Sequence, residues 1–237
     1  YLFKIHHWIK NLIIFLPVLV GHSYFKIQFL EFIIYFLILS FLSSIIYFFN
    51  NLNDYKEDIK NKKLNYILNL DKKKLYYFFG IISFFILITF TFIFNQEIFI
   101  VCLFYFLLSI SYNFYFKRQK YLDILILSFF HVLRIIYGSI AFEVDLSLYF
   151  ILFCTSIFLM IGSNKRLVEI DKSYFNRPYG KKDKRKVQIL QLFFSFFGIL
   201  VFLIYSIDRS KDQFFIYKEL LFIIVINNFN YYQFSIY

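Results

Sequence analysis

Cysteine, glycine and proline are scarce in this sequence. Only 2 of the 237 residues are Cys, 6 are Gly and 2 are Pro. Cys102 and Cys154 both lie in apolar runs without metal-ligand spacing, so we expect neither a disulfide framework nor a cysteine metal site. The few Gly and Pro residues do not fall in paired positions of the apolar segments. This disfavours a transporter built from repeated, broken helices.

The sequence is poor in charge and rich in apolar side chains. Hydrophobic residues make up 60% of the chain, charged residues make up 17%, and the mean hydropathy is +0.64. A soluble domain of this size cannot bury so much apolar surface. Several uncharged runs reach the ~20 residues that a membrane-spanning helix needs. The composition therefore predicts an all-α, polytopic membrane protein built as a helical bundle.

About eight hydrophobic helices are predicted, with room for a ninth. Their rough limits are 11–25, 29–50, 75–94, 97–116, 122–142, 146–163, 187–207 and 214–230. The first is short and contains Pro17, and the last fades into a polar and aromatic tail. The chain also starts at Tyr1 rather than Met. We therefore expect 1–237 to be a single membrane domain, truncated at both ends.

Basic residues are concentrated in alternate loops between the predicted helices. The basic set is 56–74, 117–120 and 165–186, and the alternate set is 95–97, 143–145 and 208–213. The positive-inside rule places the basic loops on the cytoplasmic side of the cell membrane. The net charge of +11 then reflects topology, so nucleic acid is not an expected partner. Anionic headgroups and phosphorylated substrates both remain open as partners.

An acidic stretch, NNLNDYKEDIKNKKLN (residues 50–65), follows the second apolar run. Asn50, Asp54 and Asp58 are spaced i, i+4, i+8 and fall within about 80° on one helical face. Mg²⁺ prefers oxygen ligands and is usually held by one or two carboxylates plus substrate phosphates. The spacing therefore suits Mg²⁺ on a diphosphate, and a solvated helix end is the alternative interpretation.

Arg134 lies inside the fifth apolar run. An Arg at the centre of a membrane helix costs ~2.5–3.5 kcal/mol on insertion scales, so such residues face a polar cavity or a partner. Asp123 is nearly three helical turns earlier and shares the face of Arg134. His131 and Gly138 lie close to the same stripe, and His131 is expected to be a hydrogen-bonded packing residue. The stripe predicts a wet interior cavity, and a buried pair with an acid of another helix is the alternative.

Other basic residues flank the first and sixth apolar runs. Lys10 and Asn11 lie at the mouth of the first helix, where they could bind a phosphate. Lys165 and Arg166 could grip substrate phosphates, because Arg gives bidentate contacts. The alternatives are an i, i+4 helix pair of Lys165 with Glu169, and a snorkelling role for Lys10.

Several segments resemble the UbiA prenyltransferase superfamily. The segment SSIIYFFNNLNDYKED resembles its first aspartate-rich motif, Y-x-x-N-D-x-x-D-x-x-x-D, through Tyr47, Asn50, Asp54 and Asp58. Asn51 stands where the family usually has Asp.

Three further segments resemble one branch of that superfamily, the decaprenyl-phosphate phosphoribosyltransferases. The segment HWIKNLIIFLPVLVG resembles the W-x-K-N…P opening of the branch through Trp8, Lys10, Asn11 and Pro17. The segment SYNFYFKRQKYLDILILSFFHVLRIIYGSIA is similar to a second motif through Tyr112, Lys117, Asp123, Arg134 and Gly138. The segment NKRLVEI resembles G-K-R-x-x-E through Lys165, Arg166 and Glu169. The segments fall in order from residue 4 to about 170.

The resemblance implies a helical bundle around one central cavity and transfer of a phosphoribosyl group from phosphoribosyl diphosphate to a polyprenyl (decaprenyl) phosphate. Mg²⁺ would be held on the leaving diphosphate by Asn50, Asp54 and Asp58. The implied phosphate-binding residues are Lys10, Asn11, Lys117, Arg134, Lys165 and Arg166, and the supporting residues are Tyr47, Asn51, Tyr112, Asp123 and Glu169. The product would be a precursor for cell-envelope sugars.

Two other functions stay open at this point. One lies within the superfamily: a prenyl diphosphate donor with an aromatic or quinone-type acceptor, for which the same acids would serve. The W-x-K-N and K-R-x-x-E segments argue against it. The other is a non-enzymatic transporter with an intramembrane Arg, and the sequence lacks the paired, Gly/Pro-broken helices that would support it.

Overall fold

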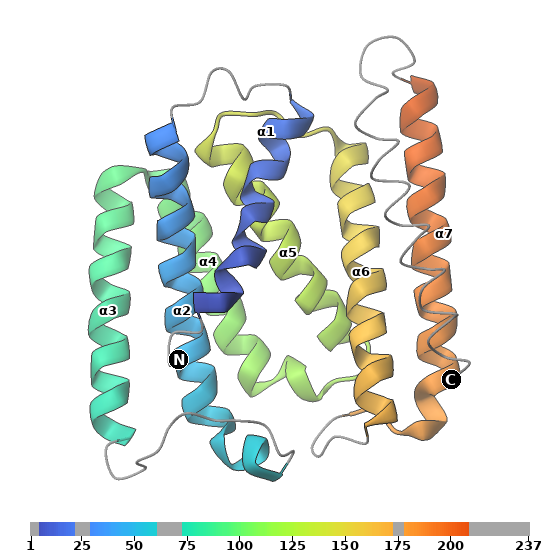
Figure 1. Ribbon diagram of the computed structural model, residues 1–237, viewed down its shortest axis with the longest axis horizontal. Helices are drawn as coiled ribbons and strands as arrows, with labels where there is room; N and C mark the ends of the chain where they lie inside the picture. Colours follow the sequence, from blue (N-terminus) through green and yellow to red (C-terminus); the bar gives the residue numbers. More distant parts are fainter. Residues whose placement is uncertain (1–4, 22–28, 61–72, 173–177, 209–237) are drawn as a thin grey trace.

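The computed structural model of the chain describes residues 5–21, 29–60, 73–172 and 178–208, and all of its regular elements there are helices (Figure 1). The α-helices are α1 (Leu16–Val20), α2 (Phe29–Lys60), α3 (Lys73–Phe94), α4 (Gln96–Phe114), α5 (Leu122–Ala141), α6 (Leu148–Asp171) and α7 (Lys184–Asp208). Three 3-10 helices accompany them: η1 (Ile5–Phe15), η3 (Phe116–Arg118) and η4 (Lys181–Asp183).

Five of the described helices are long and apolar enough to cross a membrane. They cover 29–51, 96–114, 122–141, 148–171 and 181–205, and shorter apolar helices cover 7–20 and 80–94. The prediction of an all-α, polytopic membrane protein is therefore confirmed. The predicted span at 214–230 lies outside the described residues.

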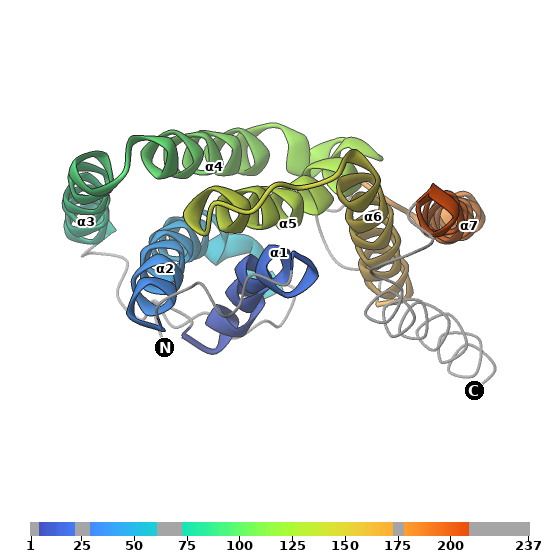
Figure 2. The ribbon, with the colours of Figure 1, turned by 90° about the horizontal axis from the view of Figure 1, so that it is seen from above.

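The helices pack mainly against their neighbours in the chain. Contacts join α2 to α3, α3 to α4, α4 to α5, α5 to α6 and α6 to α7. Seen from above, η1 and α1 lie along one side of α5 and beside α2, and both α2 and α5 contact η1 (Figure 2). The N-terminal segment therefore closes one side of the space between these two long helices.

The first apolar segment differs from its predicted form. We expected a span at 11–25, but the chain forms the 3-10 helix η1 and then the five-residue helix α1, which has Pro17 in its first turn. A Cβ atom at Gly138 of α5 would overlap the carbonyl of Ile14, so the backbones of α5 and η1 are in direct contact. Only Gly allows such a close approach.

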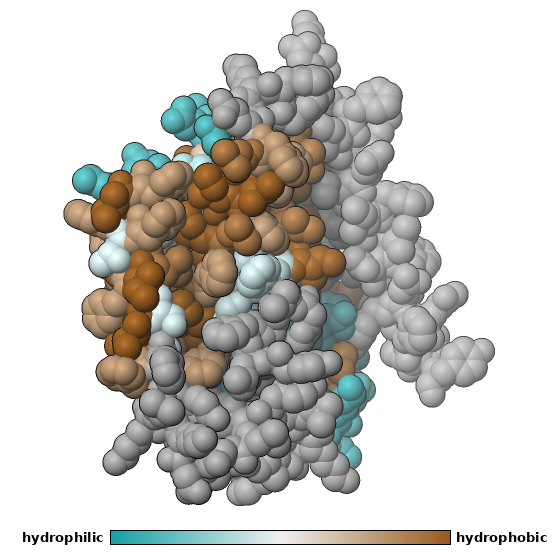
Figure 3. All heavy atoms as spheres, turned by 60° about the vertical axis from the view of Figure 1, so that its left-hand side comes forward, coloured by the Kyte–Doolittle hydropathy of each residue, from teal (hydrophilic) through white to brown (hydrophobic). Residues whose placement is uncertain are grey.

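Large apolar side chains cover the outside of the bundle. Figure 3 shows the α3 side, where hydrophobic residues dominate the described surface. The exposed residues on α3 include Phe78, Ile82, Phe85, Ile86, Phe90 and Ile93. In a soluble protein such a patch would indicate a binding surface. On a membrane-spanning helix it is the face that lipid covers.

The described basic and acidic loops lie at opposite ends of the bundle. The loop that holds η3 meets the segment before α7, where the Tyr121 amide donates to the Tyr179 hydroxyl at 2.6 Å. Asn95 and Ser147 lie at the other end, and each accepts a hydrogen bond from the first turn of the helix that it caps, α4 or α6. This segregation agrees with the predicted topology of alternating basic loops.

Helix α6 runs eight residues beyond its predicted end at 163 and includes Lys165, Arg166 and Glu169. The prediction stopped there because charges follow the apolar run. The structure buries Arg166 and Glu169 against other helices, so the helical backbone continues through them.

Candidate active site

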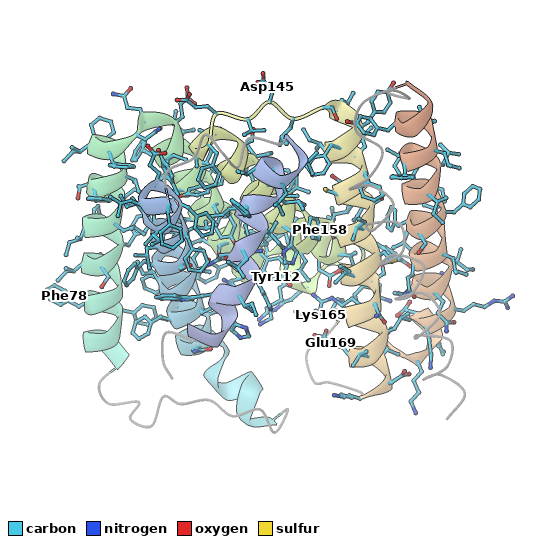
Figure 4. The ribbon with its side chains drawn as sticks, turned by 45° about the horizontal axis from the view of Figure 1, so that its top comes forward. Phe78, Tyr112, Asp145, Phe158, Lys165 and Glu169 are labelled. Atoms are coloured by element: carbon cyan, nitrogen blue, oxygen red, sulfur yellow. The ribbon has the colours of Figure 1, made fainter. Side chains whose placement is uncertain are left out.

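A cavity of about 220 Å³ lies between α2, α4, α5 and α6, near the end of the bundle that carries the described basic loops. Four basic side chains line it: Lys10, Lys117, Arg134 and Lys165. The polar neutral residues of the lining are Ser43, Tyr47, Asn50, Tyr105, Ser109, Tyr112, Asn113 and His131. No Asp or Glu is among its described lining residues. Figure 4 shows Lys165 and Glu169 towards the end of the bundle opposite Asp145, with Tyr112 nearer the middle.

Two helices contribute polar faces to this cavity. On α4, Tyr105, Ser109 and Asn113 follow each other at intervals of four, which places them on one face. On α2, Ser43, Tyr47 and Asn50 do the same at intervals of three or four. Each face is a polar stripe on an otherwise apolar helix, so the two helices supply opposite walls of one polar space.

Arg134 enters the cavity from α5 and is held on three sides. Its Nε donates to the Asn11 side-chain oxygen at 3.1 Å, its Nη1 contacts His131 Nδ1 at 2.9 Å, and its Nη2 donates to the Tyr105 hydroxyl at 2.7 Å. Since Arg can only donate, His131 Nδ1 must accept and the imidazole is neutral. His131 also stacks on Phe158, which fits the prediction of a packing residue. All three partners are therefore neutral, and the guanidinium keeps its full positive charge for the cavity.

The N-terminal segment orients Arg134 through Asn11. The Asn11 amide donates to Ser40 at 3.0 Å while its oxygen accepts from Arg134, and the residue is only 1% exposed. Trp8 anchors the same segment by donating to Ser44 on α2 at 2.8 Å. Asn11 does not line the cavity. The structure thus places it behind Arg134, and its contact with a phosphate stays a prediction.

Arg166 lies in a separate, fully buried cluster of charges. Its Nε is 2.5 Å from Asp123 Oδ2 on α5, and its Nη1 contacts Glu169 one turn further along α6. Arg166 is 0% exposed and does not line the cavity. The expected role of Arg166 as a phosphate ligand has no support in this geometry, because both of its charged partners are carboxylates.

Asp123 and Glu169 are also placed differently from the sequence interpretation. The shared face predicted for Asp123 and Arg134 does not bring their charges together, since Asp123 contacts Arg166. The Tyr179 hydroxyl also donates to Asp123, at 2.5 Å. Burial and this carboxylate raise the pKa of Tyr179 well above its usual value, so it remains a donor. Glu169 contacts Arg166 at i, i+3, and the pair of Lys165 with Glu169 at i, i+4 stays a prediction.

Tyr112 connects the charge cluster to the cavity. Its hydroxyl accepts from Arg166 Nη2 at 3.1 Å, and its side chain lines the cavity. Lys165 precedes Arg166 on α6 and also lines the cavity. The buried cluster therefore fixes the positions of two residues that a ligand in the cavity would touch.

The cavity lining includes seven of the predicted site residues: Lys10, Tyr47, Asn50, Tyr112, Lys117, Arg134 and Lys165. Asn51 is 5% exposed and is not part of the lining. The side chains of Asp54 and Asp58 lie outside the described part of the structure. Helix α2 continues to Lys60, so their backbone positions follow Asn50 at one and two turns on the same face.

Sequence reasoning missed Ser43, Tyr105, Ser109 and Asn113 as lining residues. Each is a polar side chain within an apolar run, and the i, i+4, i+8 spacing on α4 was a usable signal. Asn113 is the most notable of them, because its amide donates to Asn50 Oδ1 across the gap between α4 and α2.

Comparison with known protein families matches residues 11–164 to the UbiA prenyltransferase family. The chain belongs to the UbiA prenyltransferase family. The match covers more than half of the chain and ends just before Lys165. The comparison with curated proteins finds no match. As a UbiA protein with five long apolar helices, the chain is an integral membrane protein of a transferase family whose members act on prenyl-type lipids and diphosphates.

Members of the UbiA family generally depend on divalent metal ions, so the cavity should be tested against such an ion. In the described residues no group of three or more His, Cys, Asp or Glu side chains could hold a metal. Asn50 lines the cavity, and the backbone register places Asp54 and Asp58 one and two turns beyond it on α2. An amide and two carboxylates form a donor set that Mg²⁺ accepts when substrate phosphates complete its shell.

Proposed function

We propose that this UbiA protein transfers a phosphoribosyl group from phosphoribosyl diphosphate to a polyprenyl phosphate such as decaprenyl phosphate, and releases diphosphate. The observation that carries the proposal is the lining of the cavity, with four basic and several neutral polar side chains. Such a reaction brings together a diphosphate, the 5-phosphate of the ribose and the phosphate of the lipid. A cavity lined by cationic side chains is better suited to binding three anionic groups than to binding an uncharged aromatic acceptor.

Arg134 is the best-placed phosphate ligand of the cavity. Its three neutral hydrogen-bond partners fix the plane of the guanidinium without neutralising it. A planar guanidinium held in this way gives directed contacts to phosphate oxygens, which Lys does not. Lys10, Lys117 and Lys165 supply further positive charge from η1, η3 and α6. Arg134 would set the orientation of a phosphate that the lysines attract.

The leaving diphosphate would lie against Asn50, Asp54 and Asp58. These residues would hold Mg²⁺, which neutralises negative charge on the diphosphate when it is bound. The register of α2 supports this set, because the three residues share the face that reaches the cavity at Asn50. Asn51 would stay in the packed interior, consistent with its burial.

In the proposed reaction, the bond between C1 of the ribose and the diphosphate oxygen breaks, and an oxygen of the lipid phosphate bonds to C1. The lipid phosphate is already ionised, so no general base is required. The sugar carbon becomes oxocarbenium-like as the bond breaks. The chain's own residues bind and align the two anions, and alignment with electrostatic stabilisation can supply most of the rate.

A second candidate is transfer of a prenyl group from a prenyl diphosphate to an aromatic or quinone-type acceptor. An apolar cavity directly beside the cationic one could take the chain of this donor, as it could the chain of a polyprenyl phosphate. The same acids and basic residues would bind the diphosphate. In both cases we propose that the site opens to the cytoplasm, because the described basic loops lie at its end of the bundle.

The decisive experiment is a transfer assay with the purified full chain in lipid vesicles. It would supply Mg²⁺ and labelled phosphoribosyl diphosphate, with or without decaprenyl phosphate. Asp54→Ala would be compared with Asp145→Ala, which removes an exposed acid at the opposite end of the bundle. We expect label to enter the lipid phase with wild type and Asp145→Ala, and not with Asp54→Ala or a chelator.

The other outcomes separate the candidates. Turnover of a prenyl diphosphate with an aromatic acceptor, without phosphoribosyl transfer, would assign the chain to the second function. Transfer by Asp54→Ala at the wild-type rate would remove the acidic face from the mechanism. Absence of both activities in well-folded wild-type protein would reject the proposed reaction.

A further inference from the structure

A second cavity, of about 260 Å³, lies between α2, α3 and α4. Its lining is mostly apolar and aromatic: Ile46, Phe49, Tyr77, Ile81, Phe106, Ile110 and Phe114. Only Asn50, Ser109 and Asn113 add polar side chains other than the Tyr77 hydroxyl. A cavity with this lining accepts a hydrocarbon and offers little to a charged group.

The apolar cavity is open towards the outside of the bundle. Two of its lining residues, Ile81 on α3 and Ile110 on α4, remain 46% and 39% exposed. Both helices carry apolar outer faces, so this opening faces the hydrocarbon of the bilayer. A lipid chain could enter here sideways without crossing water, whereas its charged head would need the cationic cavity.

The two cavities meet at a bridge between two amides. Four residues line both cavities: Ile46, Asn50, Ser109 and Asn113. Within this set, the Asn113 amide donates to Asn50 Oδ1 and to the Ser109 carbonyl, the latter at 3.0 Å. Both hydrogens of the Asn113 amide are therefore used. The bridge joins α4 to α2 at the border between a charged space and an apolar one.

We propose that Asn113 is a positioning residue for the lipid substrate, acting through Asn50 at the point where the head of the lipid meets its chain. This inference rests on the proposed function, and it holds for a polyprenyl phosphate or a prenyl diphosphate. The phosphate-bearing head lies in the cationic cavity, and the first isoprenoid carbons lie in the apolar cavity. Asn113 touches neither reacting atom. It fixes the direction of the Asn50 oxygen, and with Asn50 it forms the polar boundary that keeps the isoprenoid chain out of the cationic cavity.

The orientation of Asn50 gives this role a chemical consequence. Because Asn113 donates to Asn50 Oδ1, that oxygen is directed towards α4 and retains a second lone pair for a ligand. A partner that orients a ligating residue contributes to its function even without touching the ligand. Replacing Asn113 with Leu keeps the approximate shape, removes both donors and extends the apolar cavity towards the head. The phosphate of the lipid would then no longer be held in a fixed position relative to the other substrate.

The first test maps the lipid chain without requiring turnover. The full chain in vesicles would be irradiated with a polyprenyl phosphate that carries a diazirine close to its phosphate. The same probe without the phosphate would report non-specific labelling. We expect head-dependent labelling of α4 near Phe106 and Ile110. Ile110→Trp, which fills the apolar cavity, should reduce it at least fivefold, and Leu107→Trp on the exposed face of α4 should not.

The second test measures the role of Asn113 by comparing Asn113→Leu with Ser111→Ala. Ser111 is exposed on α4 and bonds only within its own helix turn. A misplacement of about 1 Å can cost about 100-fold in rate. We therefore expect Asn113→Leu to lower kcat about 10- to 100-fold while the KM for the lipid stays within about twofold, with no change in Ser111→Ala. In the labelling experiment, Asn113→Leu should spread the label along α4.

The outcomes distinguish this inference from the proposed function. Wild-type activity with an unchanged kcat in Asn113→Leu, or a raised KM with an unchanged kcat, would overturn the positioning role. Head-dependent labelling confined to α6 and α7 would overturn the location of the chain. If wild type transfers neither group, the proposed reaction fails. The labelling pattern of Asn113→Leu then still decides the inference: a spread label supports it, and an unchanged label overturns it.

Discussion

Arg134 and Arg166 are buried arginines on neighbouring helices, and they differ in what surrounds them. Arg134 is 4% exposed, lines the cavity and hydrogen-bonds to three neutral groups. Arg166 is 0% exposed, lies outside the cavity and contacts two carboxylates. Tyr112 lies between the two regions, bonded to Arg166 and lining the cavity of Arg134.

The difference in partners predicts a binding role for Arg134 and a structural role for Arg166. A buried cation with acidic partners has its charge compensated inside the protein, and removing it leaves those acids uncompensated. A buried cation with neutral partners retains its charge for a ligand. The partners of each arginine therefore predict its role, which is ligand binding for Arg134 and structural support for Arg166. The comparison predicts that the two arginines respond oppositely to substitution.

The largest expected effect is loss of stability on removing Arg166. Arg166→Gln leaves the carboxylate of Asp123 buried without its cation, which should cost about 3–5 kcal/mol in the free energy of unfolding. Thermal unfolding of the purified protein in detergent measures it, with Lys172→Gln at the exposed end of α6 as the control. A melting temperature equal to wild type would show that the cluster is not structural.

Arg134→Gln should have the converse effect, a large loss of activity in a protein that still folds. Removal of one preorganised donor from an active site typically costs about 100- to 1,000-fold in kcat. Its partners are neutral, so the loss of stability should be clearly smaller than for Arg166→Gln. Transfer activity and thermal unfolding of the same preparation check both parts. Equal destabilisation by the two substitutions would erase the contrast between the arginines.

Gly138→Ala tests how the N-terminal segment supports Arg134. The added methyl group would meet the Ile14 backbone and push η1 away from α5, which should cost about 1–3 kcal/mol as overpacking does. Because η1 also carries Asn11, the activity should fall as well. Gly180→Ala is the matched control, since a Cβ there meets no atom within 4 Å. Unchanged stability and activity in Gly138→Ala would contradict the close approach.

Tyr112→Phe should give the smallest effect. The ring and its contact with Phe130 are kept, and one hydrogen bond from Arg166 is lost. Such a bond contributes about 0.5–1.5 kcal/mol in general, and more when the donor is charged. We expect a small decrease in melting temperature and a decrease in kcat of less than about tenfold. A loss as large as that of Arg134→Gln would place Tyr112 among the substrate ligands.

The helices could be predicted from the sequence because each apolar run of about 20 residues has one stable form in a bilayer. Their ends were less predictable. Helix α6 continues through Arg166 because an acid on α5 compensates that charge, and a partner 43 positions earlier in the sequence leaves no local pattern. The 3-10 helix η1 was likewise not predicted, and the composition of residues 5–15 gives no signal of its contact with α5.

The candidate site could be predicted only in part, because contacts between residues far apart in the sequence leave no local pattern. Basic and amide residues at the expected end of the bundle were visible as polar positions in apolar runs, and Lys10, Lys117, Arg134 and Lys165 do line one cavity. Pattern alone could not distinguish Lys165 from Arg166, because they are adjacent on α6 and point to different neighbours. The roles of these residues in catalysis remain predictions.

The hydrogen bond between Asn11 and Arg134 also constrains how the protein is made. Its two residues are 123 positions apart in the chain. At about 5–20 residues per second, the ribosome needs about 6–25 s to add α5 after the N-terminal segment has emerged. Until then, η1 and α1 have neither Gly138 nor Arg134 to dock against. The cavity therefore cannot close before α5 has been synthesised, and η1 must wait for a partner that the ribosome adds 123 positions later.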